Sequence, residues 1–498
     1  MQYEEKKHRE KFPMKSRIIL VWLCILYFSA HSQTWSEPVT IFSGGNNETP
    51  DFTIDKNGNI HSVCAHKIQT NYWKIFYSKS NDNGLTWSAT EDISLNNNLW
   101  MYNPKIVADS NNILYVSYDY NTGDPNNTII LIKKYDGVQW SNPDTVSTGL
   151  PGSMHSRLAI DNNNKLYCFW YNGISGGKIF YRTLENGIWS VITQPYTGNN
   201  EHFFLNNIVV DNMNNLHCVG AHHYAGQNGY DDRAIYFNFI NGIWSNFTEL
   251  SNNTTWEGLD IALDASDLPS ITWGQYTSDS IPPNQGTFVA SFNGSSWSTP
   301  QLLVEDHPEE QAIAIDQYNK KYVIDIEKTP TGYQQVSYTN SMNIWFGEII
   351  QQNNYGCYYH KIILRDNKLH LQYSKVDTII WQNGYLVFTS IQISNYNITT
   401  EISDYYNSNL HLSILPNPFS NLTLINFEIT SLANVQVKIL NLKGQLVNIL
   451  VNENKAPGKY SINWEGNDLN GKKVSPGLYL VRLQVGRHMV TRSVILVQ

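Results

Sequence analysis

Four residues that can perform acid–base chemistry lie close together in the middle of the sequence. His202 precedes one apolar strand pattern, His222 and Tyr224 end the next, and Arg233 follows a polar loop. If these two strands form a hairpin that turns near Met213, His202 should lie opposite His222. Paired imidazoles beside a tyrosine can abstract and donate protons, and an arginine can neutralise a substrate carboxylate. The pattern therefore predicts a candidate catalytic cluster of His202, His222, Tyr224 and Arg233.

A further set of side chains is expected around the same site. Indole rings stack on sugar faces, while imidazole, guanidinium and carboxylate groups bind hydroxyl and acidic groups. The expected ligand-binding residues are Trp100, Trp170, Trp256, Trp273, His155, Arg157, Glu257 and His360. The alternative interpretation is that such side chains only solvate the rim of a ring.

No metal and no cofactor is predicted. His202, His222, His223 and Asp231 are the alternative that comes nearest to a metal site, but no ligand spacing in the sequence is diagnostic.

A repeat must bring these distant segments together. A Trp recurs about every 50 residues. The repeated residues are Trp35, Trp87, Trp140, Trp189, Trp244, Trp297 and Trp345. In the middle units a Gly stands two or three positions before the Trp, as Gly187 does before Trp189. Because Gly adopts positive φ readily, this pattern predicts a hairpin turn that leads into a Trp strand.

Each unit also contains an apolar strand that ends in a polar turn and leads to an aromatic strand. Ile106–Asp109 and Leu114–Tyr118 form one such pair, and the pattern starts with Phe52–Asp55. Four short antiparallel strands in each unit are typical of a β-propeller. The last unit lacks a Trp strand, so the strand from Trp35 to Ile41 is predicted to close the ring inside it. The prediction is an all-β, seven-bladed propeller, with six blades and an irregular insertion as the alternative.

One unit carries a specific motif, Ser80, Asp82, Gly84, Thr86 and Trp87 in the order Ser-x-Asp-x-Gly-x-Thr-Trp. It resembles the Asp-box (BNR repeat) of the sialidase-like superfamily, which implies a propeller fold. Asp82 is interpreted as structural, because Asp in turns commonly accepts hydrogen bonds from its own backbone.

The strand order predicts which face of the ring carries function. Tight, stereotyped turns lie on one face, and the longer connections converge over the channel on the other. The cluster around His202 falls on this second face and loosely resembles that of seven-bladed polysaccharide lyases, which implies β-elimination on uronic acids. Sialidases hold their substrate with three Arg, whereas only Arg157 and Arg233 should reach this face, so sialidase activity is not expected.

Composition excludes several other classes of protein. Charged residues make up 15% of the 498, aromatic residues 13%, and the formal net charge is −9. This composition disfavours a coiled coil or a disordered chain, and binding to nucleic acid is not expected.

The two ends of the chain have their own patterns. Residues 1–32 combine basic residues, an apolar run and a small-residue cleavage pattern, which predicts a signal peptide. The propeller is expected over 33–395 and a linker over 396–411. No later run is long and apolar enough for a transmembrane segment.

The last segment, 412–498, contains the ordered elements Pro416-Asn417-Pro418, Gly458-x-Tyr-x-x-x-Trp464 and Pro476-Gly-Leu-Tyr479. These motifs resemble the C-terminal sorting domain of type IX secretion substrates. The resemblance implies an Ig-like sandwich, partnership with the type IX secretion machinery, and export across the outer membrane of a Gram-negative bacterium.

These patterns together predict a monomeric protein, secreted or attached to the outer cell surface, whose propeller binds an extracellular polysaccharide or glycoconjugate. A glycan-degrading enzyme, either a lyase or a glycoside hydrolase that uses the His202 cluster, is the first alternative. A protein-interaction scaffold is the second.

Overall fold

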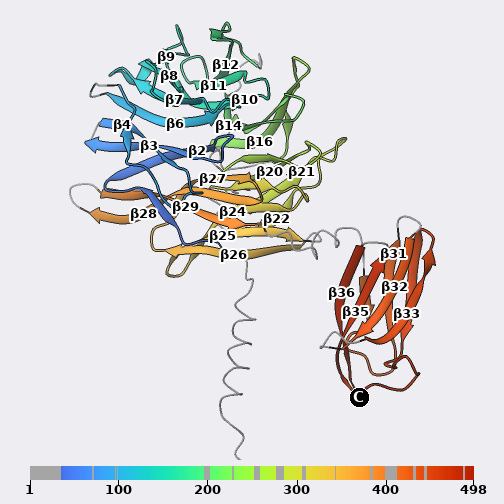
Figure 1. Ribbon diagram of the computed structural model, residues 1–498. Coiled ribbons are helices and arrows are strands. Elements are labelled where there is room, and N and C mark those ends of the chain that lie inside the picture. Colours follow the sequence, from blue (N-terminus) through green and yellow to red (C-terminus); the bar gives the residue numbers. More distant parts are fainter. Residues whose placement is uncertain are drawn as a thin grey trace, which may run out of the picture. The chain divides into compact units, whose positions relative to one another are not determined.

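This computed structural model describes residues 35–497 except 70–71, 96, 98, 196–201, 227–228, 252–257, 276–284, 306–309, 342–343, 382–384, 399–411, 430–432, 442–445 and 486–487. The chain divides into two compact units, 1–398 and 399–498. Both are built from β-strands (Figure 1). No helix among the described residues is long and apolar enough to cross a membrane.

Seven antiparallel sheets make up the described part of the first unit. The first three are β2 (Asn46–Ile54), β3 (Ile60–Gln69), β4 (Tyr72–Ser80) and β5 (Glu91–Asp92); β6 (Trp100–Ala108), β7 (Leu114–Asn121), β8 (Thr128–Tyr135) and β9 (Asp144–Thr145); and β10 (Ser153–Ile160), β11 (Leu166–Asn172), β12 (Lys178–Glu185) and β13 (Ile188–Trp189). The fourth is β14 (His202–Val210), β15 (Leu216–Gly226), β16 (Gly229–Ile240) and β17 (Ile243–Trp244), with β18 (Thr248–Glu249) also paired to β16. A short 3-10 helix, η1 (Pro125–Asn127), connects β7 to β8.

The remaining three sheets are β19 (Asp260–Leu263), β20 (Pro269–Gln275), β21 (Gly286–Ser291) and β22 (Gln301–Val304); β23 (Ala312–Ile315), β24 (Lys321–Thr329), β25 (Gly332–Ser341) and β26 (Ile344–Asn353); and β27 (Cys357–Arg365), β28 (Lys368–Trp381), β29 (Tyr385–Asn397) and β1 (Val39–Phe42). The N-terminal strand β1 thus supplies the outer strand of the last sheet, where Val39 pairs with Ile393.

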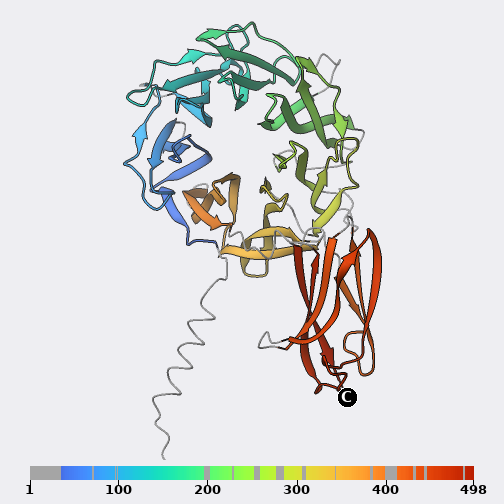
Figure 2. The same ribbon diagram turned by 45° about the vertical axis from the view of Figure 1, so that its right-hand side comes forward.

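The seven sheets stand in a ring (Figure 2). The first strand of each sheet contacts the first strand of the next, in the closed series β2, β6, β10, β14, β19, β23, β27 and back to β2. These strands therefore surround the axis, and the other strands of each sheet follow outward.

Turns at one end of the first strands tie each sheet to its neighbour. The Asp55 carboxylate accepts hydrogen bonds from Asn57 N and Asn59 N, both at 2.9 Å. The same arrangement recurs at Asp109, Asp161, Asp211, Asp264 and Asp316. Asn112, in the left-handed region at φ 61°, then accepts a hydrogen bond from Lys56 N of the preceding sheet at 2.9 Å. Polar turn residues therefore replace missing backbone partners and set the spacing of the sheets.

Apolar side chains pack between neighbouring sheets. Trp170 is 1% exposed and packs with Ile130, Ile132 and Val146 between the second and third sheets. Trp273 is fully buried between the fourth and fifth sheets. This packing corrects the sequence prediction for Trp170 and Trp273, because a buried indole cannot stack on a ligand.

The Asp82 motif builds its own turn. Asp82 Oδ1 accepts hydrogen bonds from Thr86 N at 2.9 Å and Ser80 Oγ at 2.7 Å, and Oδ2 accepts one from Thr86 Oγ1 at 2.5 Å. Gly84 has a φ of 84°, and its carbonyl accepts the Trp87 indole N–H at 3.2 Å. Both Asp82 oxygens thus take part in the turn, which agrees with a structural role.

The second unit is a two-sheet sandwich. One sheet contains β30 (Leu412–Leu415), β31 (Thr423–Ile429) and β34 (Gly458–Trp464), and the other contains β33 (Leu446–Lys455), β32 (Ala433–Leu440), β35 (Gly477–Val485) and β36 (His488–Leu496). Alternate side chains of the strands, such as Ile425, Val437 and Val481, fill a core around the buried Trp464. This alternation is the period-2 pattern expected of strands that cover one core.

Candidate functional site

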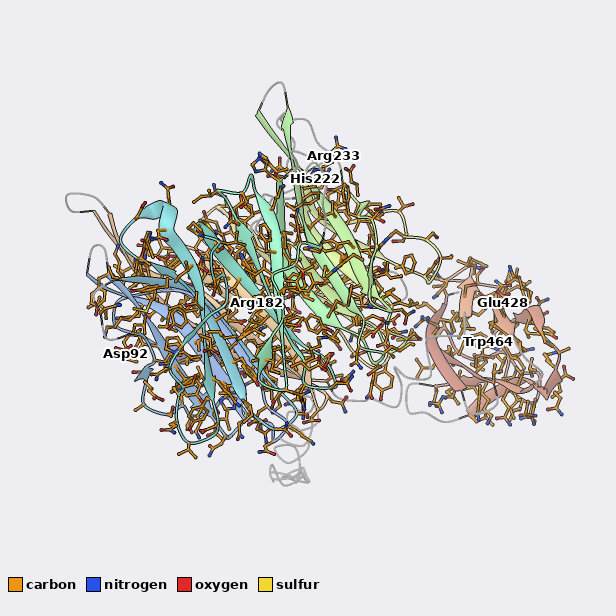
Figure 3. All side chains as sticks on the ribbon, turned by 90° about the horizontal axis from the view of Figure 1, so that it is seen from above. Asp92, Arg182, His222, Arg233, Glu428 and Trp464 are labelled. Atoms are coloured by element: carbon orange, nitrogen blue, oxygen red, sulfur yellow. The ribbon has the colours of Figure 1, made fainter. Side chains whose placement is uncertain are left out.

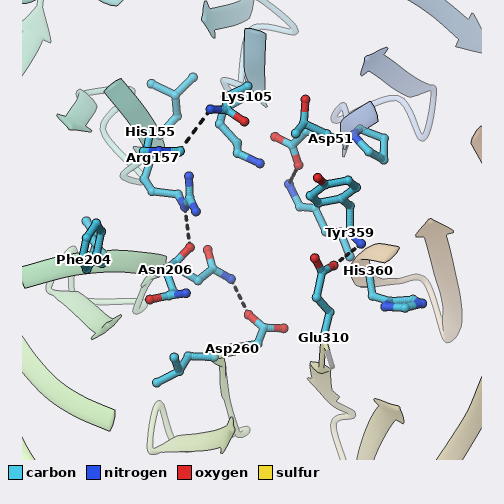
Figure 4. A pocket seen from close by; sticks show the side chains of 18 of the residues that line it. Asp51, Lys105, His155, Arg157, Phe204, Asn206, Asp260, Glu310, Tyr359 and His360 are labelled. Atoms are coloured by element: carbon cyan, nitrogen blue, oxygen red, sulfur yellow. Dashed lines mark hydrogen bonds and ion pairs between the residues drawn. The ribbon is translucent and has the colours of Figure 1, made fainter. Parts of the chain in front are cut away.

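A pocket of about 380 Å³ opens at the end of the ring where the first strands begin. Residues of six sheets line it, from Asp51 on β2 to Lys361 on β27, together with Glu310 and Gln311 just before β23, and Figure 4 shows the side chains converging from the surrounding strands. The other end of each first strand carries the Asp turns. The pocket is thus on the face of the long connections.

Bulges in the first strands direct polar side chains toward this pocket. Thr49, Asn103, His155 and Tyr359 all have left-handed φ values between 47° and 57°. The pairing register of each of these strands shifts at that point. A bulge re-aims the residues that follow it. Here the residue two positions later in each case is charged and lines the pocket: Asp51, Lys105, Arg157 and Lys361.

The acidic groups of the pocket are already engaged. Asp51 Oδ1 lies 2.6 Å from Lys361 Nζ, and Oδ2 accepts Ile106 N at 2.8 Å. Asp260 accepts Ile313 N at 2.8 Å and Asn207 Nδ2 at 2.5 Å. Glu310 accepts Tyr359 N. Asp51 and Asp260 thus each join their own sheet to both neighbouring sheets, and Glu310 joins the segment before β23 to β27.

Two cations lie on the wall between β6 and β10. Arg157 Nε donates to Asn206 O at 2.5 Å and Nη1 donates to Ser156 O at 3.0 Å, which fixes the guanidinium plane. Lys105 is half-buried, and burial together with repulsion from Arg157 and Lys361 lowers its pKa to about 8, despite the nearby Asp51. Figure 4 shows both side chains extending toward the middle of the pocket.

Behind this wall lies a buried carboxylate. Asp119 Oδ2 accepts Asn103 Nδ2 at 2.8 Å and His155 N at 3.1 Å, and burial raises the pKa of Asp119 to about 6. Burial and the charges of Arg157 and Lys105 lower the pKa of His155 to about 4. His155 is therefore neutral at pH 7.

An aromatic group lies at the rim of the pocket. Trp100 is 47% exposed at the start of β6, and its ring lies 6.2 Å from that of Tyr102, which lines the pocket. Tyr102 packs edge-on against Trp73 at 5.0 Å and donates its hydroxyl to Glu48. The exposed indole is thus held next to the pocket on a fixed support.

The sequence prediction for the pairing of His202 was wrong by one residue. His202 pairs with His223, and His222 pairs with Phe203. Val210 pairs with Leu216, so the turn is centred on Met213 and alone would place His202 opposite Tyr224; a register shift between Leu205 and Asn207 moves His202 by one residue, to His223. Because successive side chains point to opposite faces of a sheet, His223 and not His222 shares a face with His202.

His222 is 1% exposed, stacks on Phe203 at 4.5 Å and lies 3.7 Å from Glu249. Arg233 Nη1 donates to the same Glu249 at 2.8 Å, and Figure 3 labels His222 and Arg233 on this sheet. His222 therefore lies in the packing of the sheet, Arg233 is 31% exposed beside it, and neither residue lines the pocket.

His202 and His223 form the pair that the sequence pattern assigned to His202 and His222. His202 is exposed and its ring lies 5.8 Å from that of His223. His223 Nδ1 is 2.5 Å from Asp232 Oδ1. The backbone of Tyr224 pairs with Asp231, and its side chain is not described.

The other predicted ligand-binding residues divide into two groups. His155, Arg157 and His360 line the pocket. The pKa of His360 is lowered to about 3 by burial, so this imidazole is neutral. Trp256 and Glu257 lie outside the described residues. No group of three or more His, Cys, Asp or Glu among the described residues is arranged to hold a metal ion.

Lys105, Lys361 and Asp51 were not predicted, although the repeat contains the signal, which Asp260 shares. Each stands four positions before the polar residue that ends its strand and begins the turn, as Lys105 does before Asp109 and Asp260 before Asp264. Aligning the repeats on the turn Asp would have placed these charged residues in one ring.

Known proteins resemble each unit. Residues 422–487 match the FlgD Ig-like domain. No curated protein sequence matches the chain. A solved polysaccharide lyase described as an ulvan lyase aligns with a TM-score of 0.52 and 11% identity, over 68% of this chain and 93% of that chain.

The same kind of lyase bound to -[GlcA(1-4)Rha3S]- gives a TM-score of 0.50 and 10% identity over the same shares. An α-L-arabinanase of Penicillium chrysogenum gives 0.44 and 12% identity, over 72% of this chain and 98% of that one. The chain therefore contains a β-propeller of the fold seen in the lyase structures, and an Ig-like domain follows it.

Proposed function

We propose that this protein is an exported β-propeller that binds glycans through the face on which its central pocket opens. The observation that carries the proposal is the combination, at one mouth, of an exposed indole and a polar pocket. Trp100 is 47% exposed beside a pocket lined by residues of six sheets and of the segment before β23. Carbohydrate sites combine an aromatic platform with directional polar groups, because sugars present both apolar faces and hydroxyls.

The wider organisation is part of the same proposal. The seven sheets are taken as seven blades of a sialidase-like propeller, and the described C-terminal unit as a type IX sorting domain. Residues 1–32 are proposed to be a signal peptide. These assignments place the protein outside the cell or on its outer surface, where polysaccharides and glycoconjugates are available, and they make the secretion machinery a partner of the C-terminal unit.

The test is glycan-array binding by the wild-type protein and by Trp100→Ala. We expect binding to at least one glycan class and its loss in the variant, while Trp170→Phe, a change at a buried indole, retains it. Wild-type binding that persists unchanged in Trp100→Ala would place the glycan elsewhere on the protein.

A glycan-degrading enzyme is the second candidate, and the contact between His223 and Asp232 favours it. When Nδ1 of His223 donates to the carboxylate, the lone pair of the ring lies on Nε2, which can then take up a proton. His202 is the exposed second imidazole next to it. The test is release of unsaturated or reducing-end products from polysaccharides by wild type, His202→Ala and His223→Ala. If the wild-type protein releases no product from any polysaccharide tested, this candidate is excluded.

A further inference from the structure

One position of the repeat holds a polar residue in six of the seven first strands. The residues are Asp51, Lys105, Arg157, Asn207, Asp260 and Lys361. Five of them are joined to a neighbouring sheet. The bonds are Asp51 to Lys361, Arg157 to Asn206 O, and Asn207 to Asp260. Lys105 differs, because its Nζ has no hydrogen bond or ion pair with any residue that the structure describes.

A half-buried ammonium without a partner is unfavourable, because it gives up water without gaining a counter-charge. Burial is the main cause that lowers the pKa of Lys105; Asp51 and Glu310 oppose it, while repulsion from Arg157 and Lys361 lowers the pKa further. Unpaired buried charges of this kind are often found at binding sites, where a ligand supplies the missing counter-charge.

The acids of the pocket are bonded to groups other than Lys105, although the charges of Asp51 and Glu310 also act on Lys105 and raise its pKa. Asp51 is neutralised by Lys361, and Asp260 accepts two backbone N–H groups, Ile261 N and Ile313 N. Asp119 lies behind the wall, and Asn103 Nδ2 and His155 N occupy its Oδ2.

Arg157 is the second cation on the wall that holds Lys105. Its Nε and Nη1 donate to backbone carbonyls, and no partner of Nη2 is found within the described part of the chain. A guanidinium held in this way presents a fixed donor edge, whereas the Lys105 ammonium is a point charge that can approach an oxygen from several directions.

We propose that Lys105 and Arg157 form a subsite for an oxyanion carried by the glycan, either the carboxylate of a uronic acid or a sulfate ester. This inference rests on the proposed glycan-binding function and adds the ligand class. The anion replaces the counter-charge that Lys105 lacks and reduces its repulsion with Arg157. A neutral glycan of the same size would leave both cations uncompensated.

The test compares three oligosaccharides by calorimetry: a glucuronic acid-containing tetrasaccharide, its carboxyl-reduced neutral form, and a sulfated neutral tetrasaccharide. The variants are Lys105→Met, Lys105→Arg, and Lys134→Met as a control at an exposed lysine on β8. We expect wild type and Lys134→Met to bind an acidic probe at least about tenfold more tightly than the neutral one, which corresponds to one charge-assisted contact. Lys105→Met should lose this preference and Lys105→Arg should keep it.

The two acidic probes identify the source of the oxyanion, since a uronate site prefers the carboxylate and a sulfate site prefers the ester. Equal binding of acidic and neutral probes by wild type, or a preference that survives in Lys105→Met, overturns the subsite while glycan binding itself stands.

A second measurement separates the two proposals if no glycan binds. Free sulfate and D-glucuronate are titrated against thermal unfolding of the full chain. Stabilisation of wild type but not of Lys105→Met supports the oxyanion subsite and removes the glycan-binding function. Equal responses of the two proteins overturn the subsite as well.

Discussion

Lys361 and Asp51 form an ion pair, with 2.6 Å between Nζ and Oδ1, that joins the last sheet of the ring to the first. The two residues are 310 positions apart in the chain, and Asp51 also accepts the backbone N–H of Ile106 on the second sheet. One carboxylate therefore links three sheets at the point where the ring closes.

We predict that Asp51→Ala lowers the free energy of unfolding by about 2–4 kcal/mol, because it leaves a buried N–H and a half-buried ammonium without partners. Urea denaturation followed by tryptophan fluorescence measures the change. Glu185→Ala is the control, since its pair with Lys165 is exposed and should change stability by less than about 0.5 kcal/mol. Equal effects of the two substitutions would show that Asp51 does not close the ring.

Trp100→Ala should weaken glycan binding by about 1–3 kcal/mol, the usual range for loss of a stacking aromatic ring. The fold should be unaffected, because the indole is 47% exposed. Trp170→Phe should do the opposite, lowering stability without changing affinity. Calorimetric affinity and thermal unfolding measured on both variants check this pair of outcomes, and a Trp100 variant that unfolds early would argue that the ring supports the strand instead.

Binding of an acidic glycan should depend on pH in two limbs. The pKa of Asp119 is raised to about 6 by burial, so its negative charge near Arg157 and Lys105 disappears as the pH falls through 6, and affinity for an anion should rise. The pKa of Lys105 is lowered to about 8 by burial, so affinity should fall above pH 8, by up to about tenfold per pH unit for one linked proton.

Affinity profiles from pH 5 to about pH 9 test both limbs. Asp119→Asn should remove the acidic limb and Lys105→Arg the alkaline limb, because arginine stays protonated. His155 should contribute nothing in this range, since its pKa is lowered to about 4. An alkaline limb that survives in Lys105→Arg would assign it to another group.

Lys105→Met should stabilise the protein in the absence of ligand, by roughly 1 kcal/mol, because it removes an unpaired half-buried charge. A lysine whose folded pKa lies below its unfolded value binds fewer protons in the folded state between about pH 8 and 10, so wild-type stability should rise with pH in that range. The stability difference between wild type and Lys105→Met should therefore shrink from pH 7 to pH 10. A Met variant that is less stable at pH 7 would contradict an unpaired Lys105.

His222→Phe should keep the fold and the function, because His222 stacks on Phe203 at 4.5 Å and packs against Phe247 at 5.1 Å. His223→Phe should instead disturb the contact with Asp232. Comparison of the two variants in binding and product-release assays checks whether function depends on the His202 and His223 pair. Loss of function in His222→Phe alone would restore the sequence-based assignment.

The sequence predicted the sheets well, because the Trp repeat and the turn Asp residues recur at a fixed spacing and are local signals. It predicted the N-terminal strand as the closing strand of the last sheet, and β1 does pair with β29. It also identified His155, Arg157 and His360, all of which line the pocket.

The remaining site residues depended on features that a sequence pattern does not contain. The register of the hairpin, with its turn centred on Met213 and a bulge between Leu205 and Asn207, places His223 and not His222 opposite His202. Trp170 and Trp273 were expected at the mouth because of their position near strand ends, but alternation of side chains directs both into the interfaces between sheets. Lys105 was missed because the sequence does not show that its ammonium, unlike the side chains at the same position of the other repeats, makes no hydrogen bond or ion pair with the described residues.

The most direct test of glycan binding at this mouth is a crystal structure of the protein with the tightest ligand from the glycan array. The account predicts a sugar ring stacked on Trp100 and an acidic substituent within hydrogen-bond distance of Lys105 Nζ and Arg157. A sugar bound on another face of the propeller, or no glycan bound by the protein at all, would contradict it.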